Sequence, residues 1–180
     1  MKYDEERAAN AERLEETVSA LLRARGATLA AAESCTGGLV AKRMTDPAGA
    51  SRVFAGGVVS YTNEVKERAL GVPRAMLDEY GAVSAPVARA MAEGVRTVTG
   101  ARLGVSVTGV AGPDGDGWGN PIGTVYIALA GAEGTRCRLF RFGEHERGRI
   151  RSLAADGALE LVRCSLTGGP LPGEDAPGEK

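Results

Sequence analysis

The sequence predicts an α/β protein, a three-layer α/β/α sandwich whose sheet is mixed and partly parallel. Helical patterns precede and separate the first strand patterns, and a hairpin pattern comes late, so both parallel and antiparallel pairs are expected. Of the 180 residues, 43% are hydrophobic and 25% are charged, a balance typical of globular domains. A chain of this length favours a single domain, placed at 1–166, that buries roughly 70% of its unfolded surface.

The first four elements are two helices and two strands. Apolar residues recur on one helical face from Leu14 to Leu22, and Gly26 fits the position just after a helix end. The next apolar run consists of small residues, which is consistent with a buried strand. We expect a helix over 8–25, a strand over 27–33, a helix from about Thr36 to Asp46, and a strand over 54–62.

Three helices are expected in the middle of the chain. Asn63 is a suitable N-cap for the first, and glycine and proline stop signals follow its end at Leu70. A second short helix is expected over 73–80. Pro86 fits the first turn of a longer helix, and its inner face is expected to carry Val87, Met91, Gly94 and Val98.

The C-terminal half is expected to complete the sheet. Alternating apolar residues from Leu103 to Val107 indicate a strand, and Gly131 and Gly134 stand between the arms of a hairpin. A last helix is indicated by an apolar stripe from Ile150 to Leu161. The predicted segments are a strand over 102–109, a glycine-dense loop over 111–123, hairpin strands over 124–130 and 137–142, and a disordered polar tail over 167–180.

Composition argues against several classes of function. The formal net charge is −1, so no general attraction to nucleic acid or to an anionic membrane is expected. No apolar run is long enough for a membrane span, and the acidic start is unlike a signal peptide, so a cytoplasmic protein is expected. Three widely spaced cysteines suit reduced thiols. With one histidine, His145, interpreted as a solvated residue, and no paired ligand motif, no metal site is expected.

Three segments repeat one pattern, a strand followed by hydroxyl-bearing or small residues and, in two of them, glycine. They are 34–38, 60–66 and 108–115. If the three strands are parallel neighbours, these loops open at one edge of the sheet, where ligands of α/β folds bind. Each has a simpler explanation as well: Ser34 or Thr36 could merely cap the following helix. Neither a P-loop nor a dinucleotide-binding motif is present.

Lys66 allows the two interpretations to be separated. With Asn63 as the N-cap, Lys66 stands at the third helical position, where the helix dipole disfavours a positive charge. An ordinary lysine amine is neutral in only about one molecule in a few thousand at pH 7. A role as a base therefore requires Lys66 to be desolvated, since burial lowers the pKa of an amine. A merely structural role requires it to be exposed.

Residues from about 8 to 165 closely resemble the nicotinamide-nucleotide amidase family, which also occurs as the C-terminal domain of the competence- and damage-inducible protein CinA. One departure is visible: the family usually has Gly-Asp-Arg before its last helix, and this chain has His145, Glu146 and Arg147, with Arg151 matching a second family arginine. The matching stretches are AAESCTGGLVAKRMTDPAGAS, GGVVSYTNEVKERALGV, YGAVSAPVARAMAEG, VSVTGVAGPDG and NPIGTVYIAL.

The resemblance implies hydrolysis of the carboxamide of nicotinamide mononucleotide, in pyridine nucleotide salvage, without a metal or organic cofactor. It implies a stand-alone domain, a homodimer, and a small-molecule mononucleotide as partner. It assigns Ser34 as nucleophile, Lys66 as base and Tyr61 as a hydrogen-bonding relay. Cys35 is a less suitable nucleophile, because no histidine is placed to activate it. The substrate-binding residues that the resemblance and the glycine loops indicate are Cys35, Thr36, Gly37, Gly38, Thr108, Gly109, Gly112 and Arg147.

A catalytically silent nucleotide-binding module is the alternative. It retains the glycine loops but has no use for a nucleophile and a base. The presence of Ser34, Tyr61 and Lys66 together favours the enzyme.

Overall fold

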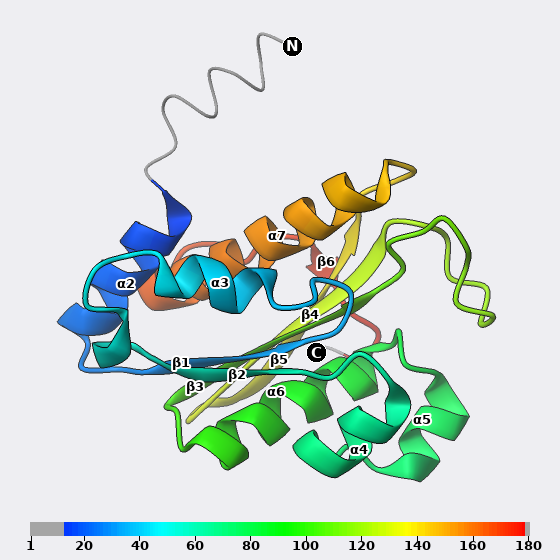
Figure 1. Cartoon of the computed structure of the whole chain (residues 1–180), viewed down its shortest axis with the longest axis horizontal. Helices are drawn as coiled ribbons and strands as arrows, with labels where there is room; N and C mark the ends of the chain where they lie inside the picture. The colour runs from blue at the N-terminus through cyan, green and yellow to red at the C-terminus, as the bar shows by residue number, and fades with distance from the viewer. Residues whose placement is uncertain (1–12, 179–180) are drawn as a thin grey trace, which may run out of the picture.

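The computed structural model describes residues 13–178. Its centre is a six-stranded sheet in the order β2-β1-β3-β4-β5-β6. Figure 1 shows helices α2, α3 and α7 on one face of this sheet and α4, α5 and α6 on the other. The predicted three-layer sandwich with a mixed, partly parallel sheet is confirmed.

The first half of the chain builds the parallel part of the sheet. β1 pairs in parallel with β2 on one side and with β3 on the other, so the carboxyl ends of these strands meet at one edge, as the sequence analysis required. The elements are α2 (Leu14–Ala24), β1 (Leu29–Glu33), α3 (Leu39–Thr45), a 3-10 turn η1 (Ala50–Arg52), β2 (Phe54–Val59) and β3 (Leu103–Gly109). The part of the first predicted helix at 8–12 lies outside the described residues.

Three helices connect β2 to β3: α4 (Asn63–Leu70), α5 (Arg74–Tyr80) and α6 (Ala85–Thr99). The N-cap of α4 is Thr62, whose hydroxyl accepts a hydrogen bond from the Val65 N–H, so the predicted Asn63 cap is wrong by one residue. Lys66 is accordingly the fourth helical residue rather than the third.

The buried face of α6 differs from the prediction at one position. Val87 and Met91 are buried as expected, but Val98 is 60% exposed. The buried face is centred further round the helix, on Ala88 and Val95, which leaves Val98 at its margin in the last turn. Gly94 is needed for close packing, because a β-carbon there would lie 2.0 Å from the Leu70 carbonyl oxygen of α4.

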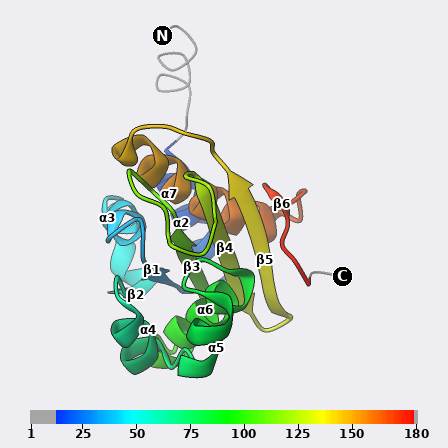
Figure 2. The ribbon, with the colours of Figure 1, turned by 90° about the vertical axis from the view of Figure 1, so that its right-hand side faces the viewer.

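The last elements complete the sheet with antiparallel pairs. β4 (Thr124–Gly131) and β5 (Gly134–Arg141) form the predicted hairpin, and α7 (Arg147–Thr167) returns across the sheet. The predicted disordered tail is wrong for residues 168–178, because β6 (Glu174–Asp175) pairs with β5 along its outer edge (Figure 2). Arg138 holds this segment by donating to the Pro172 carbonyl at 2.9 Å and by pairing with Asp175.

The main apolar core lies between the sheet and the layer of α2, α3 and α7. Ala154, Ala155 and Ala158 bring α7 close to the strands, and a smaller cluster lies under α6. Within residues 13–178, no helix combines the length and the apolar character that a membrane span requires. The core thus anchors α7 and β1, two of the elements that position the groups described next.

Candidate active site

Ser34 and Lys66 meet at the carboxyl edge of the parallel strands. Ser34 follows β1 directly, and its N–H donates to the Val107 carbonyl at 3.0 Å. Lys66 Nζ donates to Ser34 Oγ at 3.0 Å and to the Ser60 carbonyl at 2.8 Å. Lys66 is only 1% exposed. The desolvation that a base role demands is therefore present.

Burial changes the acidity of the Lys66 ammonium. Desolvation lowers the pKa of Lys66 from 10.5 to about 8, although Cys35 and Glu64 partly oppose the shift. At pH 7, about a tenth of the molecules then carry a neutral amine, several hundred times more than for an ordinary lysine. A neutral amine that donates to the Ser60 carbonyl keeps its lone pair for the Ser34 hydroxyl.

Glu33 caps α3, a function for which the sequence analysis considered Ser34 and Thr36. Its carboxylate accepts hydrogen bonds from the N–H groups of Gly38 at 2.9 Å, Val40 at 3.1 Å and Ala41 at 2.7 Å. Glu33 is buried at the end of β1. This role was missed, and an acid closing a strand of small buried residues just before a glycine pair was the available signal. Ser34 is thereby free of capping.

The side chains of Cys35 and Thr36 turn away from solvent. Desolvation is the main reason that the pKa of the Cys35 thiol rises to about 12, so the thiol stays protonated at neutral pH and is a poor nucleophile. The Thr36 hydroxyl is buried and has no hydrogen-bond partner among the described residues. Any contact of these two residues with a ligand would therefore use backbone groups.

Gly37 and Gly38 both have left-handed backbone conformations, with φ of +59° and +99°. The guanidinium of Arg151 lies against Gly37, since a β-carbon there would be 3.1 Å from Arg151 Nη2. Arg151 donates to the Cys35 carbonyl at 3.1 Å and to the Thr36 carbonyl at 2.9 Å. In the sequence, Arg151 matches a family arginine but carries no assigned role.

Tyr61 lies at the rim and not beside the buried pair. It is 56% exposed, and its hydroxyl accepts a hydrogen bond from Arg147 at 2.6 Å. Arg147 also donates to the Gly112 carbonyl at 2.5 Å, so it links the loop after β2 to the loop after β3. The hydrogen-bond acceptors of Lys66 are Ser34 and Ser60, and a relay through Tyr61 is not formed in this geometry.

The residues predicted in the third loop have different surroundings. The Thr108 hydroxyl donates to the Ala82 carbonyl at 2.7 Å, which ties β3 to the turn before α6. Gly109 allows close packing, because a β-carbon there would lie 2.6 Å from Val125 Cγ2. Gly112 alone of the three lines a pocket. The structure thus gives Thr108 and Gly109 structural contacts and places Gly112 beside Arg147.

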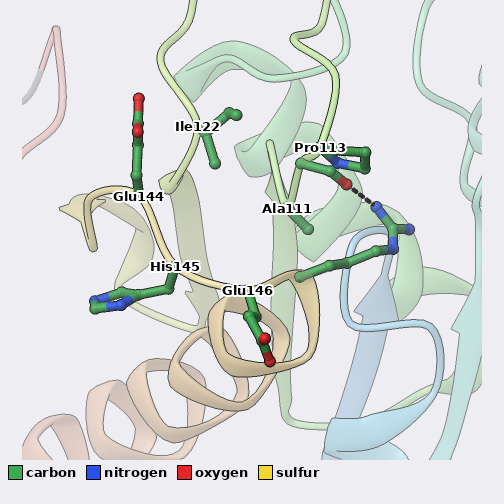
Figure 3. Close-up of a pocket in the computed structure, with 8 residues that line it drawn as sticks. Ala111, Pro113, Ile122, Glu144, His145 and Glu146 are labelled. Atoms are coloured by element: carbon green, nitrogen blue, oxygen red, sulfur yellow. Dashed lines mark hydrogen bonds between the residues drawn. The ribbon is translucent and has the colours of Figure 1, made fainter.

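A pocket of about 400 Å³ lies next to this arginine, within the usual range for small-molecule sites. Figure 3 shows Ala111 and Pro113 on one side of it and Glu144 and His145 on the other. Neither Ser34 nor Lys66 lines it, and the pocket is linked to the loop after β2 by the hydrogen bond from Arg147 to Tyr61. Its lining residues are Ala111, Gly112, Pro113, Ile122, Glu144, His145, Glu146 and Arg147.

The two arginines of the site offer donors to an anion, although Glu144 and Glu146 also line the pocket beside Arg147. Arg147 and Arg151 donate to carbonyl and hydroxyl oxygens rather than to carboxylates. Within residues 13–178, no group of three His, Cys, Asp or Glu side chains is arranged to hold a metal. A neutral amine and a hydroxyl, bordered by two guanidinium groups, can support nucleophilic attack on an anionic substrate.

Comparison with known proteins places these residues in a family context. The model of the CinA C-terminal domain matches residues 11–166. A CinA-like protein of Geobacter sulfurreducens is 55% identical over 153 residues, which cover 85% of this chain and 37% of that protein. A CinA-like protein of Anaeromyxobacter dehalogenans is 51% identical over the same length, with the same two coverages. The chain therefore spans less than two fifths of the length of these relatives.

Solved structures share the fold. The competence/damage inducible protein CihA from Agrobacterium tumefaciens matches with a TM-score of 0.80 and 36% identity, covering 87% of this chain and 97% of that one. A CinA superfamily protein from Klebsiella pneumoniae matches with a TM-score of 0.83 and 31% identity, covering 86% and 96%.

Proposed function

The chain belongs to the CinA C-terminal domain family, and from that membership and the buried Ser34–Lys66 contact we propose that it is a serine amidohydrolase acting on nicotinamide mononucleotide. The products are nicotinate mononucleotide and ammonia. The observation that carries this proposal is the hydrogen bond between Lys66 Nζ and Ser34 Oγ at 3.0 Å in a desolvated setting. The choice of substrate rests on the family resemblance and on the Arg147 guanidinium at the rim.

The proposed reaction uses the contact between Lys66 and Ser34. The neutral Lys66 amine takes the Ser34 proton as Oγ attacks the carboxamide carbon, and the carbonyl oxygen becomes an oxyanion. Collapse of this intermediate breaks the C–N bond, and the Lys66 ammonium returns the proton to the departing ammonia. Lys66 then takes a proton from water as the water oxygen attacks the ester carbon, the C–Oγ bond breaks, and the Lys66 ammonium returns this proton to Ser34 Oγ as the acid product leaves and ionises to the carboxylate.

The rim supplies binding. Arg147 carries a charge that no carboxylate neutralises among its hydrogen-bond partners, so it suits the substrate phosphate. Tyr61, which Arg147 holds, presents a half-exposed aromatic ring at the same place. No metal or organic cofactor takes part in this scheme. We further propose that the protein works as a homodimer in pyridine nucleotide salvage, and sedimentation analysis tests the assembly state.

Ammonia release from nicotinamide mononucleotide by the purified chain tests the proposed activity. We expect release by the wild type and none above background by Ser34→Ala. Ser165→Ala, an exposed serine on α7, is the matched control and should retain full activity. If the folded wild type binds the nucleotide but releases no ammonia, the chain is a binding module instead.

A further inference from the structure

The first turns of α7 connect to all three site loops. Arg147 donates to Tyr61 after β2 and to Gly112 after β3, and Arg151 donates to the carbonyls of Cys35 and Thr36 after β1. The two arginines are four residues apart and therefore lie on one face of the helix. The two arginines differ in their position relative to the pocket. Arg147 borders the pocket, whereas Arg151 is not among its lining residues.

We infer that Arg151 is a positioning residue for the reaction, one that keeps the Ser34 loop (residues 34–38) in its reactive shape without binding the substrate phosphate. This inference rests on the proposed amidohydrolase function. It extends that function by assigning a role to a residue that the sequence analysis left without one.

The contacts of Arg151 support this assignment. Its Nε and Nη2 atoms face two successive carbonyl oxygens, and Nη2 lies 3.1 Å from where a β-carbon at Gly37 would stand. A guanidinium presents such parallel donors in a fixed plane, which a lysine ammonium cannot reproduce. Two hydrogen bonds to one short loop, with no carboxylate partner, commit this side chain to the loop.

The loop needs an external support because its own geometry is weakly determined. Gly37 and Gly38 both have positive φ angles, and glycine populates positive and negative φ about equally, so these residues do not by themselves fix the loop in one conformation. Two backbone hydrogen bonds close the turn, from the Gly37 N–H to the Ser34 carbonyl at 3.1 Å and from the Leu39 N–H to the Thr36 carbonyl at 3.3 Å, and Glu33 accepts from the Gly38 N–H at 2.9 Å. Arg151 adds two more, and it is held in turn by its neighbours Ile150 and Ala154, which are buried in the main core.

Fixing the Cys35 carbonyl also fixes the next amide. In a trans peptide, the carbonyl and the following N–H point in opposite directions, so the Thr36 N–H points away from Arg151. No acceptor for this N–H lies among the described residues. A free backbone amide two residues after the nucleophile is suited to hold the oxyanion, and Arg151 orients it through the shared peptide plane.

Steady-state kinetics of Arg151→Met and Arg151→Lys with nicotinamide mononucleotide test the inference, together with nicotinamide riboside, which lacks the phosphate. A positioning role predicts that Arg151→Met lowers kcat by about 100-fold and changes KM by less than about threefold. The loss in kcat/KM should be equal for the two substrates, because the phosphate is not involved. Arg151→Lys should recover less than about a tenth of the lost rate, since an ammonium cannot serve both carbonyls.

Arg136→Met, an exposed arginine on β5, is the matched control and should behave as wild type. A fluorophosphonate probe, with labelling of Ser34 followed by mass spectrometry, reads the same geometry without the nucleotide. If the wild type reacts with the probe and Arg151→Met reacts about 100-fold more slowly, the inference holds even where the nucleotide proves not to be a substrate.

Three results would overturn the inference. One is a rise in KM for the mononucleotide with kcat retained and no effect on the riboside, which would make Arg151 a phosphate ligand. Another is wild-type behaviour of Arg151→Met in both assays. The third result applies if thermal unfolding shows that Arg151→Met does not fold. Arg151→Lys is then the test variant, and a folded Arg151→Lys with wild-type kcat would overturn the inference.

Discussion

The Ser34 loop and the glycine-rich loop (residues 111–123) both follow parallel strands, yet the fold holds them differently. The Ser34 loop is fixed from outside, by Glu33 at the amides of α3 and by Arg151 at two carbonyls. The glycine-rich loop is held mainly from within, by Asp116, which accepts from the N–H groups of Trp118 and Asn120 and from the Asn120 amide. At its two ends the loop is tied by Arg147, which donates to the Gly112 carbonyl, and by the Phe142 N–H, which donates to the Gly123 carbonyl at 3.0 Å. Its outer part is linked by the Asn120 bond to the Val83 carbonyl at 3.1 Å.

This difference suggests that the Ser34 loop serves the catalytic step and the glycine-rich loop serves substrate binding. Catalytic groups must keep their relative positions to within less than an ångström, and in this protein they lie where charged side chains fix the backbone. A hydrogen bond to a charged group is strong and directional in a low-dielectric setting. The outer part of the glycine-rich loop is exposed, so its hydrogen bonds compete with water and stabilise it less. We therefore expect changes at the Ser34 loop to reduce kcat and changes at the glycine-rich loop to alter KM.

The largest effect is expected from Ser34→Ala. Removing the nucleophile should lower kcat for ammonia release by at least about a thousandfold. Stability should change by less than about 1 kcal/mol, because the lost hydrogen bond leaves Lys66 with the Ser60 carbonyl. Urea unfolding beside the ammonia assay measures both. Retention of a tenth of the activity would remove Ser34 from the mechanism.

Lys66 predicts a specific dependence on pH. Only the neutral amine accepts the Ser34 proton, so kcat/KM should rise with pH and level off above about pH 8. Lys66→Met should abolish this rise along with the activity. A profile that is flat between pH 6 and 9 would show that Lys66 does not act as the base.

The lowered pKa of Lys66 should also make the free energy of unfolding depend on pH, because the unfolded chain has an ordinary lysine at this position. The folded-state pKa of Lys66 lies at about 8, below the ordinary 10.5, so the unfolded chain binds more protons between these values. The free energy of unfolding therefore rises with pH across this window, by about 3 kcal/mol relative to Lys66→Met. The Cys35 thiol acts in the opposite sense above pH 9, because its pKa is raised to about 12. Both proteins are therefore best compared in a Cys35→Ala background.

Glu33 and Asp116 provide a direct comparison of the two loops, since each carboxylate accepts three hydrogen bonds. Glu33→Gln should lower the free energy of unfolding by about 2–3 kcal/mol, because an amide nitrogen would face buried N–H donors. Asp116→Asn should cost less than about 1 kcal/mol, since water can replace its partners. Chemical denaturation measures both, with the exposed Glu133→Gln as control. Equal costs would contradict the distinction drawn between the loops.

The sequence was sufficient for the architecture because its signals were local. Small buried residues at 29–33 and alternation at 103–107 marked the parallel strands, and the edge where their loops meet followed from topology. The sequence was not sufficient where the conformation of a segment depends on contacts with a residue distant in the chain. Arg138 orders residues 172–175, and no pattern within the tail indicates this.

The candidate site shows the same limit. A lysine in the first turns of α4 suggested a base, but its burial beside Ser34 and Ser60 depends on how the loops after β1 and β2 pack, which periodicity cannot place. Arg151 stands 115 residues after Thr36, and only the crossing of α7 over the Ser34 loop brings them together. The cap at Glu33 was in principle readable, because a charged residue closing a buried strand requires local donors.

The smallest effect is expected from Trp118→Ala. Trp118 is the only tryptophan of the chain, is more than half exposed, and lies over Gly81, where a β-carbon would be 2.7 Å from its Cδ2 atom. Truncation removes this contact but leaves the Asp116 and Asn120 bonds, so we expect a loss of less than about 1 kcal/mol in unfolding free energy. KM should change by up to about threefold and kcat by less than twofold, because Trp118 belongs to the glycine-rich loop, lies outside the pocket lining and has no bond to Ser34 or Lys66. Far-UV circular dichroism follows unfolding in both proteins, since the variant lacks the fluorophore. A fall in kcat comparable to that of Ser34→Ala would place the glycine-rich loop in the catalytic centre and erase the separation between the two loops.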